Sequence, residues 1–180
     1  MNILDKLISI VLPVYNGAEF LNQSIDSIIR QTYTNWELLV LDDCSTDNTP
    51  NIVKEYVKKD SRIHYYRNEQ NLKLPGNLNK GFSLSKGDYL TWTSDDNMFH
   101  DNALEVMYKT ITSQKVDLVY ASYNIIDEKG NVVIPFGDLY EVDYDETYQG
   151  EEIKAMSAVA GKLYIVTEKT RDDLLNLHIF

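Results

Sequence analysis

Apolar runs alternate with amphipathic stretches along most of the chain. Five runs are rich in branched and aromatic residues and predict strands: residues 7–14, 36–41, 62–67, 88–93 and 116–125. The first two contain few polar residues, which is typical of strands buried on both faces of a sheet. Between the runs, apolar residues recur at helical spacing, as at Leu21, Ile25 and Ile28. Strands alternating with helices predict an α/β fold, a mostly parallel sheet flanked by helices.

Capping residues and breakers predict where the helices begin and end. Thr49 followed by Pro50 is typical of an N-cap and a first helical residue. The polar stretch 68–77 is expected to be a loop before the third helix, and Gly87 is expected to cap that helix at its C-terminal end. Asp101 is expected to cap the fourth helix.

The alternating pattern weakens toward the C-terminus. Residues 127–136 predict a hairpin turn into a shorter strand. Residues 137–152 are acidic and aromatic without a clear period, which is typical of a long surface loop. Residues 161–167 predict another strand, and residues 168–180 the start of a helix. We therefore expect one region to cover residues 1–136 and a second, incomplete one to cover residues 137–180.

Composition narrows the classes of function. The net charge of −11 argues against a nucleic-acid-binding surface, although a diphosphate remains compatible if a divalent cation accompanies it. Cys44 is the single cysteine, so an internal disulfide and a zinc ribbon are excluded. No apolar run is as long as a membrane span, and the basic start of a signal peptide is missing. We therefore expect a cytoplasmic protein.

Polar residues follow three of the expected strands directly: Tyr15-Asn16, Asp42-Asp43 and Asp95-Asp96. Each pair alone is an ordinary turn sequence. In an open parallel sheet, however, the carboxyl ends of the strands share one edge, and ligands bind there. No P-loop, G-x-G-x-x-G or G-x-S-x-G motif is present, and the three histidines lack metal-ligand spacing. A carboxylate-held Mg²⁺ or Mn²⁺ that bridges to a phosphorylated ligand is the chemistry that fits.

The stretch "ISIVLPVYNGAEFLNQSIDSIIRQTYTNWELLVLDDCSTDNT" resembles the start of a family 2 inverting glycosyltransferase with the GT-A (Rossmann-like) fold. The resemblance covers roughly residues 7–125. It implies transfer of a sugar from a nucleotide-diphosphate donor, commonly a UDP-sugar, to a hydroxyl of a glycan or another acceptor. It also implies that residues 1–136 bind the donor and that residues 137–180 belong to the acceptor side.

Matching positions imply individual roles. The resemblance places the donor contacts at the ends of the first, second and fourth strands and in the loop before the third helix; they are Pro13, Tyr15, Asn16, Glu19, Asp42, Asp43, Lys73, Ser94 and Asp95. Tyr15 would lie near the base and ribose, and Asp43 would accept a hydrogen bond from uracil. Asp96 would bind Mn²⁺ or Mg²⁺.

Several positions depart from the family pattern. Thr93 stands where the metal motif often begins with a further Asp. Cys44, Lys73 and Pro75 stand where glycines are usual. An inverting transfer also needs a carboxylate base, which the family carries in an acidic motif that we expect beyond Phe180. The chain would then be a fragment, truncated before that motif.

Two other functions stay open. One is a donor-binding module without turnover, which the missing base favours. The other is a sugar nucleotidyltransferase, which should carry a Gly-rich basic loop after the first strand, where this chain has "PVYNGAEF". An exposed apolar surface left by truncation would also favour a homodimer.

Overall fold

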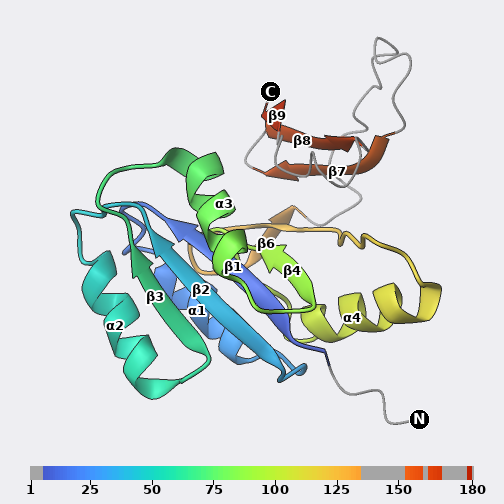
Figure 1. Cartoon of the computed structure of the whole chain (residues 1–180), viewed down its shortest axis with the longest axis horizontal. Coiled ribbons are helices and arrows are strands. Elements are labelled where there is room, and N and C mark those ends of the chain that lie inside the picture. Colours follow the sequence, from blue (N-terminus) through green and yellow to red (C-terminus); the bar gives the residue numbers. More distant parts are fainter. Residues whose placement is uncertain (1–5, 135–152, 160–161, 168–177, 180) are drawn as a thin grey trace. The chain divides into compact units, whose positions relative to one another are not determined.

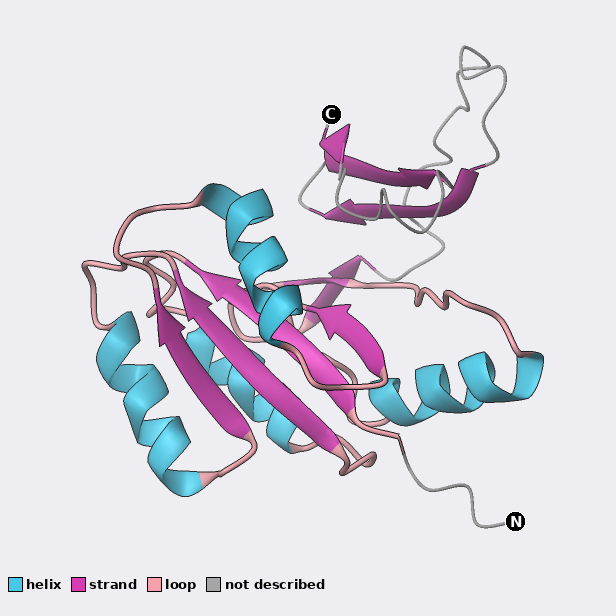
Figure 2. Cartoon of the chain, in the orientation of Figure 1, coloured by secondary structure: helices cyan, strands magenta, loops and turns pink. Residues whose placement is uncertain are grey.

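The computed structural model describes residues 6–134, 153–159, 162–167 and 178–179 (Figures 1 and 2). The chain divides into two compact units, Met1–Val106 and Met107–Phe180. The first unit contains the ends of the strands at which the sequence predicts a ligand site.

Four parallel strands form the sheet of the first unit: β1 (Ile8–Val14), β2 (Trp36–Asp42), β3 (Ile63–Arg67) and β4 (Tyr89–Trp92). Their order in the sheet is β3-β2-β1-β4. The strands β2 and β3 are therefore added on one side of β1, and β4 is added on its other side. All seven residues of β1 and of β2 are buried, which confirms the prediction of two central strands. The predicted α/β fold with a parallel sheet is therefore confirmed.

Helices cover both faces of this sheet. Figure 1 shows α1 (Leu21–Ile29) behind the strands and α3 (Lys73–Leu84) in front of them, with α2 (Thr49–Lys59) beside β3. Val11 of β1 and Leu39 and Leu41 of β2 form a core cluster with Leu78 of α3. Gly81 allows this close packing, because a Cβ at that position would lie 2.3 Å from Val11 Cγ1.

Two helix boundaries differ from their predictions. α2 begins at Thr49 rather than after it, and the Thr49 hydroxyl accepts a hydrogen bond from the Gly17 amide instead of capping the helix. α3 begins at Lys73, inside the stretch expected to be loop. Pro75 is compatible with this start because a helix leaves its first amides without intrahelical partners.

Gly87 does not cap α3, which ends at Leu84 with Ser85 after it. Gly87 instead passes close to β1, where a Cβ would lie 2.6 Å from the Ser9 amide nitrogen. Its own amide donates to Ser9 Oγ at 2.8 Å. The glycine is thus needed for a close backbone approach rather than for a left-handed cap.

The second unit begins within α4 (Ala103–Gln114). β5 (Ile125–Ile126) and β6 (Val132–Ile134) form the predicted hairpin, with Gly130 at φ 82° in its turn. The strand predicted over residues 116–125 is wrong except at Ile125. Most of its aromatic and branched residues are exposed, with 72% of Tyr120 accessible. A strand-like composition forms a strand only where a partner strand is available.

A separate antiparallel sheet contains β7 (Ile153–Val159), β8 (Lys162–Thr167) and β9 (His178–Ile179). β8 confirms the strand predicted over residues 161–167 within its described part. β9 shows that the expected C-terminal helix does not include His178 and Ile179. The expected loop 137–152 and residues 168–177 lie outside the described residues. Within the described parts of the chain, no helix is both long and apolar enough to cross a membrane.

Candidate functional site

The loop after β1 is tied to the loop after β2. Asn16 has φ 56°, in the left-handed region that asparagine tolerates better than most residues. Its side-chain Oδ1 accepts from the Thr46 amide at 2.7 Å, and its own amide donates to Ser45 Oγ at 2.9 Å. Of the residues predicted here, Pro13 is buried within β1, whereas Tyr15 and Glu19 are exposed. Tyr15, 55% accessible, exposes its aromatic ring at the carboxyl end of β1.

Asp42, the last residue of β2, is fully buried. Its carboxylate accepts from the Ser45 amide at 2.7 Å and from the Tyr65 hydroxyl at 2.5 Å, and Arg67 lies 3.7 Å away. Burial raises the pKa of Tyr65 to about 12, and the bond to Asp42 adds to this. The Asp42 carboxylate is therefore used within the protein, where it fixes the start of the loop after β2.

Asp43, only 3% accessible, organises the loop before α3. Its Oδ1 accepts from the Leu72 amide and from Asn68 Nδ2, both at 2.8 Å, and its Oδ2 accepts from the Lys73 amide at 3.0 Å. Lys73 itself has φ 62°, in the left-handed region. The left-handed turn and the carboxylate thus hold each other in place, and the Lys73 side chain is exposed.

Asn68, which donates to Asp43, belongs to a buried network of side-chain amides. Asn68 donates to Asn77 Oδ1 at 2.8 Å, and Asn77 donates to the Leu41 carbonyl at 2.7 Å. Lys80 Nζ donates to Asn68 Oδ1 at 2.7 Å. The ends of β2 and β3 and the helix α3 are thereby joined around one carboxylate.

The segment after β4 carries the second acidic pair. Thr93 is buried and its amide donates to the Val11 carbonyl at 3.0 Å, so it continues the pairing with β1. Ser94, partly buried, donates to Asp95 Oδ1 at 3.3 Å. Asp95 is partly buried and Asp96 is exposed. The two acids therefore differ: one packs against the protein, and the other faces solvent.

Asp95 packs directly against the loop after β1. A Cβ at Gly17 would lie 1.9 Å from Asp95 Oδ2, so only glycine fits beside this carboxylate. Burial raises the pKa of Asp95 above its ordinary value, and the charges of Asp96 and Asp47 raise it further. The loop after β1 and the acidic pair after β4 are thus in contact at Gly17 and Asp95.

Asp47 is a third acid beside this contact. Its carboxylate accepts from the Ala18 amide and from the Thr49 amide, each at 3.0 Å. Burial acts to raise the pKa of Asp47, but the hydrogen bonds from Thr49 and Ala18 outweigh it and lower the pKa. Among the described residues, Asp47, Asp95 and Asp96 have no ion-pair partner. The edge of the sheet therefore holds negative charge that the described residues do not neutralise.

Carboxylate oxygens are the ligands that Mg²⁺ and Mn²⁺ prefer. Nevertheless, no three His, Cys, Asp or Glu side chains within the described residues are placed to share one metal ion. The carboxylates of Asp47, Asp95 and Asp96 are the type of ligand that suits a hard cation, but they are too few to hold one alone. Such an ion would need further oxygen ligands from a bound molecule.

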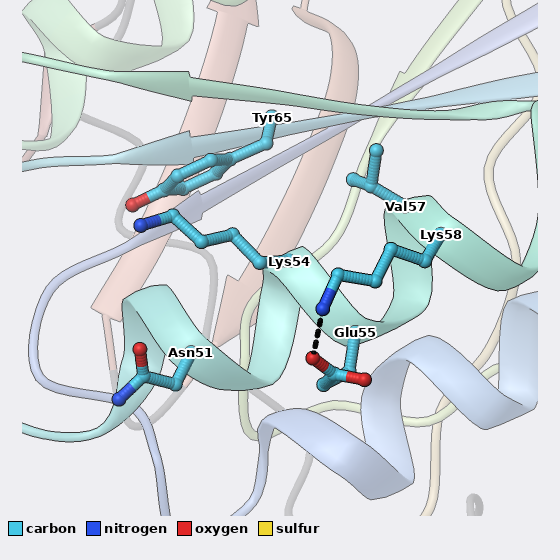
Figure 3. Close-up of a pocket in the computed structure, with 6 residues that line it drawn as sticks. All are labelled: Asn51, Lys54, Glu55, Val57, Lys58 and Tyr65. Atoms are coloured by element: carbon cyan, nitrogen blue, oxygen red, sulfur yellow. Dashed lines mark hydrogen bonds and ion pairs between the residues drawn. The ribbon is translucent and has the colours of Figure 1, made fainter.

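A shallow hollow of about 430 Å³ lies elsewhere, between α2 and the edge strand β3 (Figure 3). It contains none of the predicted site residues, and its Lys58 is paired with Glu55 at 2.5 Å. Tyr65 joins it to the carboxyl edge through the bond to Asp42. The hollow is a surface feature beside the site rather than the site itself.

Sequence reasoning did not single out Ser45, Asp47, Asn68 and Asn77, which help to build this edge, and it expected Thr49 to cap a helix rather than to bond to Gly17. Their signal was present for Asp47 and Thr49, which end the polar run "DDCSTDNT" after β2. Asn68 and Asn77 lie within or beside the stretch expected to be loop, so nothing local indicated that both side chains are buried.

The first unit is thus an α/β domain with the parallel strand order β3-β2-β1-β4 and with acidic residues at the carboxyl ends of its strands. Residues 9–163 match the family described as "Glycosyl transferase family 2", and the chain belongs to this family. An uncharacterized glycosyltransferase of Rickettsia felis is 38% identical over 135 residues, which are 73% of this chain and 22% of that protein. Glycosyltransferase GlyA of Streptococcus pneumoniae is 33% identical over 173 residues, 90% of this chain and 25% of that protein. The chain therefore spans a quarter or less of these relatives.

Solved structures agree on the fold. Residues 1–349 of S. aureus TarS, in complex with UDP, are 25% identical with a TM-score of 0.57, covering 60% of this chain and 32% of that one. The mannosyltransferase PcManGT from Pyrobaculum calidifontis, in complex with GDP-Man and Mn²⁺, has a TM-score of 0.57 over 61% of this chain and 33% of that one. At 21% identity, this second likeness shows the fold alone.

Proposed function

We propose that this domain binds a nucleotide-diphosphate sugar, most simply a UDP-sugar, and that the protein transfers the sugar to an acceptor hydroxyl with inversion. The observation that carries the proposal is the unneutralised charge of Asp47, Asp95 and Asp96 beside the loop after β1. A divalent cation brought in with a diphosphate would neutralise this charge. Membership of the glycosyltransferase family and the UDP bound by the TarS structure support the choice of donor.

The base end of the donor is assigned to Tyr15 and Asp43. Tyr15 is exposed at the end of β1 and can stack on a planar base. Asp43 accepts three hydrogen bonds from the protein, which leaves its carboxylate one acceptor position for the N3–H of uracil. Asp42 is fully buried and takes part by fixing the loop that carries Asp43. Lys73 and Glu19, both exposed, are assigned to the rim of the site.

The phosphate end is assigned to the segment after β4. Asp96 faces solvent and would bind Mn²⁺ or Mg²⁺ together with the diphosphate oxygens, while Asp95 would contact the ribose or the donor sugar. When bound, such a cation neutralises the diphosphate and acts as a Lewis acid for the departing nucleotide. PcManGT, which shares the fold, is complexed with Mn²⁺. With Thr93 in place of an acid, affinity for the cation would depend on Asp96 and the donor.

Calorimetry with UDP, with and without Mn²⁺, tests this proposal. We expect binding that requires the metal and that weakens at least about tenfold in Asp96→Ala, equivalent to about 1.4 kcal/mol. Asp88→Asn is the matched control, since Asp88 is exposed at the other edge of the sheet and paired with Lys6. Equal UDP affinity with and without the metal would contradict the role of Asp96.

Turnover needs a second measurement, because an inverting transfer requires a carboxylate base to deprotonate the acceptor. We predict that base beyond Phe180. UDP-sugar hydrolysis and transfer should therefore be compared between this chain and a version extended past Phe180. Transfer by the extended version alone is the expected result, whereas full transfer by this chain would place the base within it.

A further inference from the structure

Three polar side chains of α1 and the turn after it are buried where apolar ones would be expected. Ser24, Ser27 and Gln31 are each at most 4% accessible. Their spacing of three and four residues places them on one side of the helix. They alternate with Leu21, Ile25 and Ile28, which fill the core. A buried polar row is costly unless every group finds a partner, so its partners indicate what it does.

Apart from two bonds to carbonyls within α1, the partners are main-chain groups of the segment that follows β4. Ser24 Oγ donates to the Ser94 carbonyl at 2.9 Å, and the Phe99 amide donates to Ser27 Oγ at 3.0 Å. Gln31 bonds to this segment twice. Its Nε2 donates to the His100 carbonyl at 2.7 Å, and its Oε1 accepts from the Leu104 amide at 3.0 Å.

These bonds hold the segment after β4 in place on both sides of its acidic pair. Ser94 precedes Asp95 and Asp96, and Phe99 and His100 follow them within four residues. The start of the α1 region adds a steric limit, since Asp95 packs against Gly17. Because these bonds join backbone groups of the segment, they fix its position whatever side chains it carries.

We propose that Ser24, Ser27 and Gln31 are positioning residues of the donor site. They hold the segment after β4 so that Asp95 and Asp96 stay beside the loop after β1, against the mutual repulsion of these acids and Asp47. The inference rests on the proposed function, because the geometry they protect is the one assigned to the cation and diphosphate. A site held in place before the ligand arrives binds it with less ordering cost.

Variants of the row test the proposal when two probes are compared. Ser27→Ala removes the acceptor of the Phe99 amide. Gln31→Leu, at similar volume, removes both bonds to the segment after β4 and the bond to the Ser27 carbonyl. We expect each to weaken UDP binding in Mn²⁺ at least about tenfold by calorimetry. Uridine lacks the diphosphate that Asp96 and the cation would bind, so its affinity, followed by NMR titration, should fall less than that of UDP.

Tyr56→Phe is the matched control. It removes the bond from the Tyr56 hydroxyl to Asp26 Oδ1 at 2.8 Å, which joins α1 to α2 instead of to the segment after β4. Both affinities should stay within about twofold of wild type. A general loosening of α1 would instead weaken UDP and uridine binding alike in all three variants, and that result would overturn the proposal.

Hydrogen exchange of backbone amides in the ligand-free protein tests whether UDP binding weakens because the segment after β4 is held less firmly. Exchange at the Phe99 amide should accelerate at least about tenfold in Ser27→Ala, and exchange at the Leu104 amide should do the same in Gln31→Leu. The Asn68 amide, which is bonded to the Asp42 carbonyl, should exchange at the same rate in both variants. Weaker UDP binding without faster exchange at these amides would overturn the proposal. Unchanged UDP binding in both variants would overturn this inference alone. Failure of wild type to bind UDP with Mn²⁺ would overturn the proposed function and this inference together.

Discussion

At the amino edge of the four-stranded sheet the acids Glu37 and Asp60 lie beside basic side chains, whereas at the carboxyl edge most acids do not. Glu37, in β2, lies 3.7 Å from His64, and also accepts from Ser9 Oγ at 2.6 Å. Asp60, just before β3, is bonded to Arg62 at 2.7 Å, and this guanidinium lies over the Trp36 ring. Each of these acids has its partner within the protein.

The acids of the carboxyl edge are satisfied differently. Asp42 has Arg67 at 3.7 Å, but Asp43 is held by backbone amides and Asn68. Asp95 and Asp96 have no ion pair among the described residues. Neutral donors satisfy hydrogen bonds without cancelling charge. The acids at the amino edge therefore have side-chain partners within the protein, whereas the described residues leave Asp95 and Asp96 at the carboxyl edge without an ion pair.

Backbone strain shows the same asymmetry. Asn16, Cys44 and Lys73 are the non-glycine residues with positive φ in the described part of the first unit, at 56°, 66° and 62°. They follow β1, β2 and β3 respectively, so all three lie at the carboxyl edge. Strain of this kind persists where surrounding contacts enforce it and is common at functional sites.

The largest expected effect is on stability at the carboxyl edge, where Asp43 is held by hydrogen bonds and Asp96 faces solvent. Asp43→Ala leaves three donors without their acceptor, so it should lower the free energy of unfolding by about 3 kcal/mol. Asp96→Ala removes an exposed acid and should change it by less than about 0.5 kcal/mol. Urea denaturation measures both.

Asp43→Asn is the graded control, because its amide keeps one acceptor oxygen; we expect a loss of about 1–2 kcal/mol. If Asp96→Ala were as destabilising as Asp43→Ala, the distinction at this edge between an acid that holds its loop and an acid that only faces solvent would be wrong.

The sequence predicts the elements of this edge better than their interactions. Periodicity located β1 and β2 because both are buried along their whole length, and topology then required Asp43 and Asp95 to share an edge. It did not reveal that Asn68 and Asn77 are buried, since each depends on a partner distant in the chain. The strand predicted from residue 116 was wrong for the same reason: composition is local, whereas pairing is not.

The strain at the carboxyl edge is tested by Lys73→Gly. Glycine adopts φ 62° without the clash of a Cβ, and the Lys73 amide would still donate to Asp43. We expect the variant to be more stable by about 0.5–1 kcal/mol in urea denaturation. Lys54→Gly is the control, an exposed lysine inside α2 with ordinary helical geometry, and should cost about 1 kcal/mol. Equal losses in both variants would show that Lys73 is not strained.

The smallest expected effect tests the pairing at the amino edge through pH. The hydrogen bond from Arg62 lowers the pKa of Asp60 below its ordinary value, and burial opposes this less strongly. A carboxylate with a lowered pKa in the folded state contributes stability above its unfolded pKa of about 4 and loses it as pH falls through the folded value. Wild type should therefore exceed Asp60→Asn at pH 7 by at most about 1 kcal/mol, since solvent screens part of the interaction.

That difference should shrink steadily in urea denaturation series taken from pH 5 down to pH 2, and high salt should reduce it at pH 7. A difference that stays constant with pH would mean that Asp60 acts through the shape of its turn, where it also accepts from the Arg62 amide, rather than through its charge. The amino edge would then be held by hydrogen bonds like those around Asp43, and charge balance would no longer distinguish the two edges of the sheet.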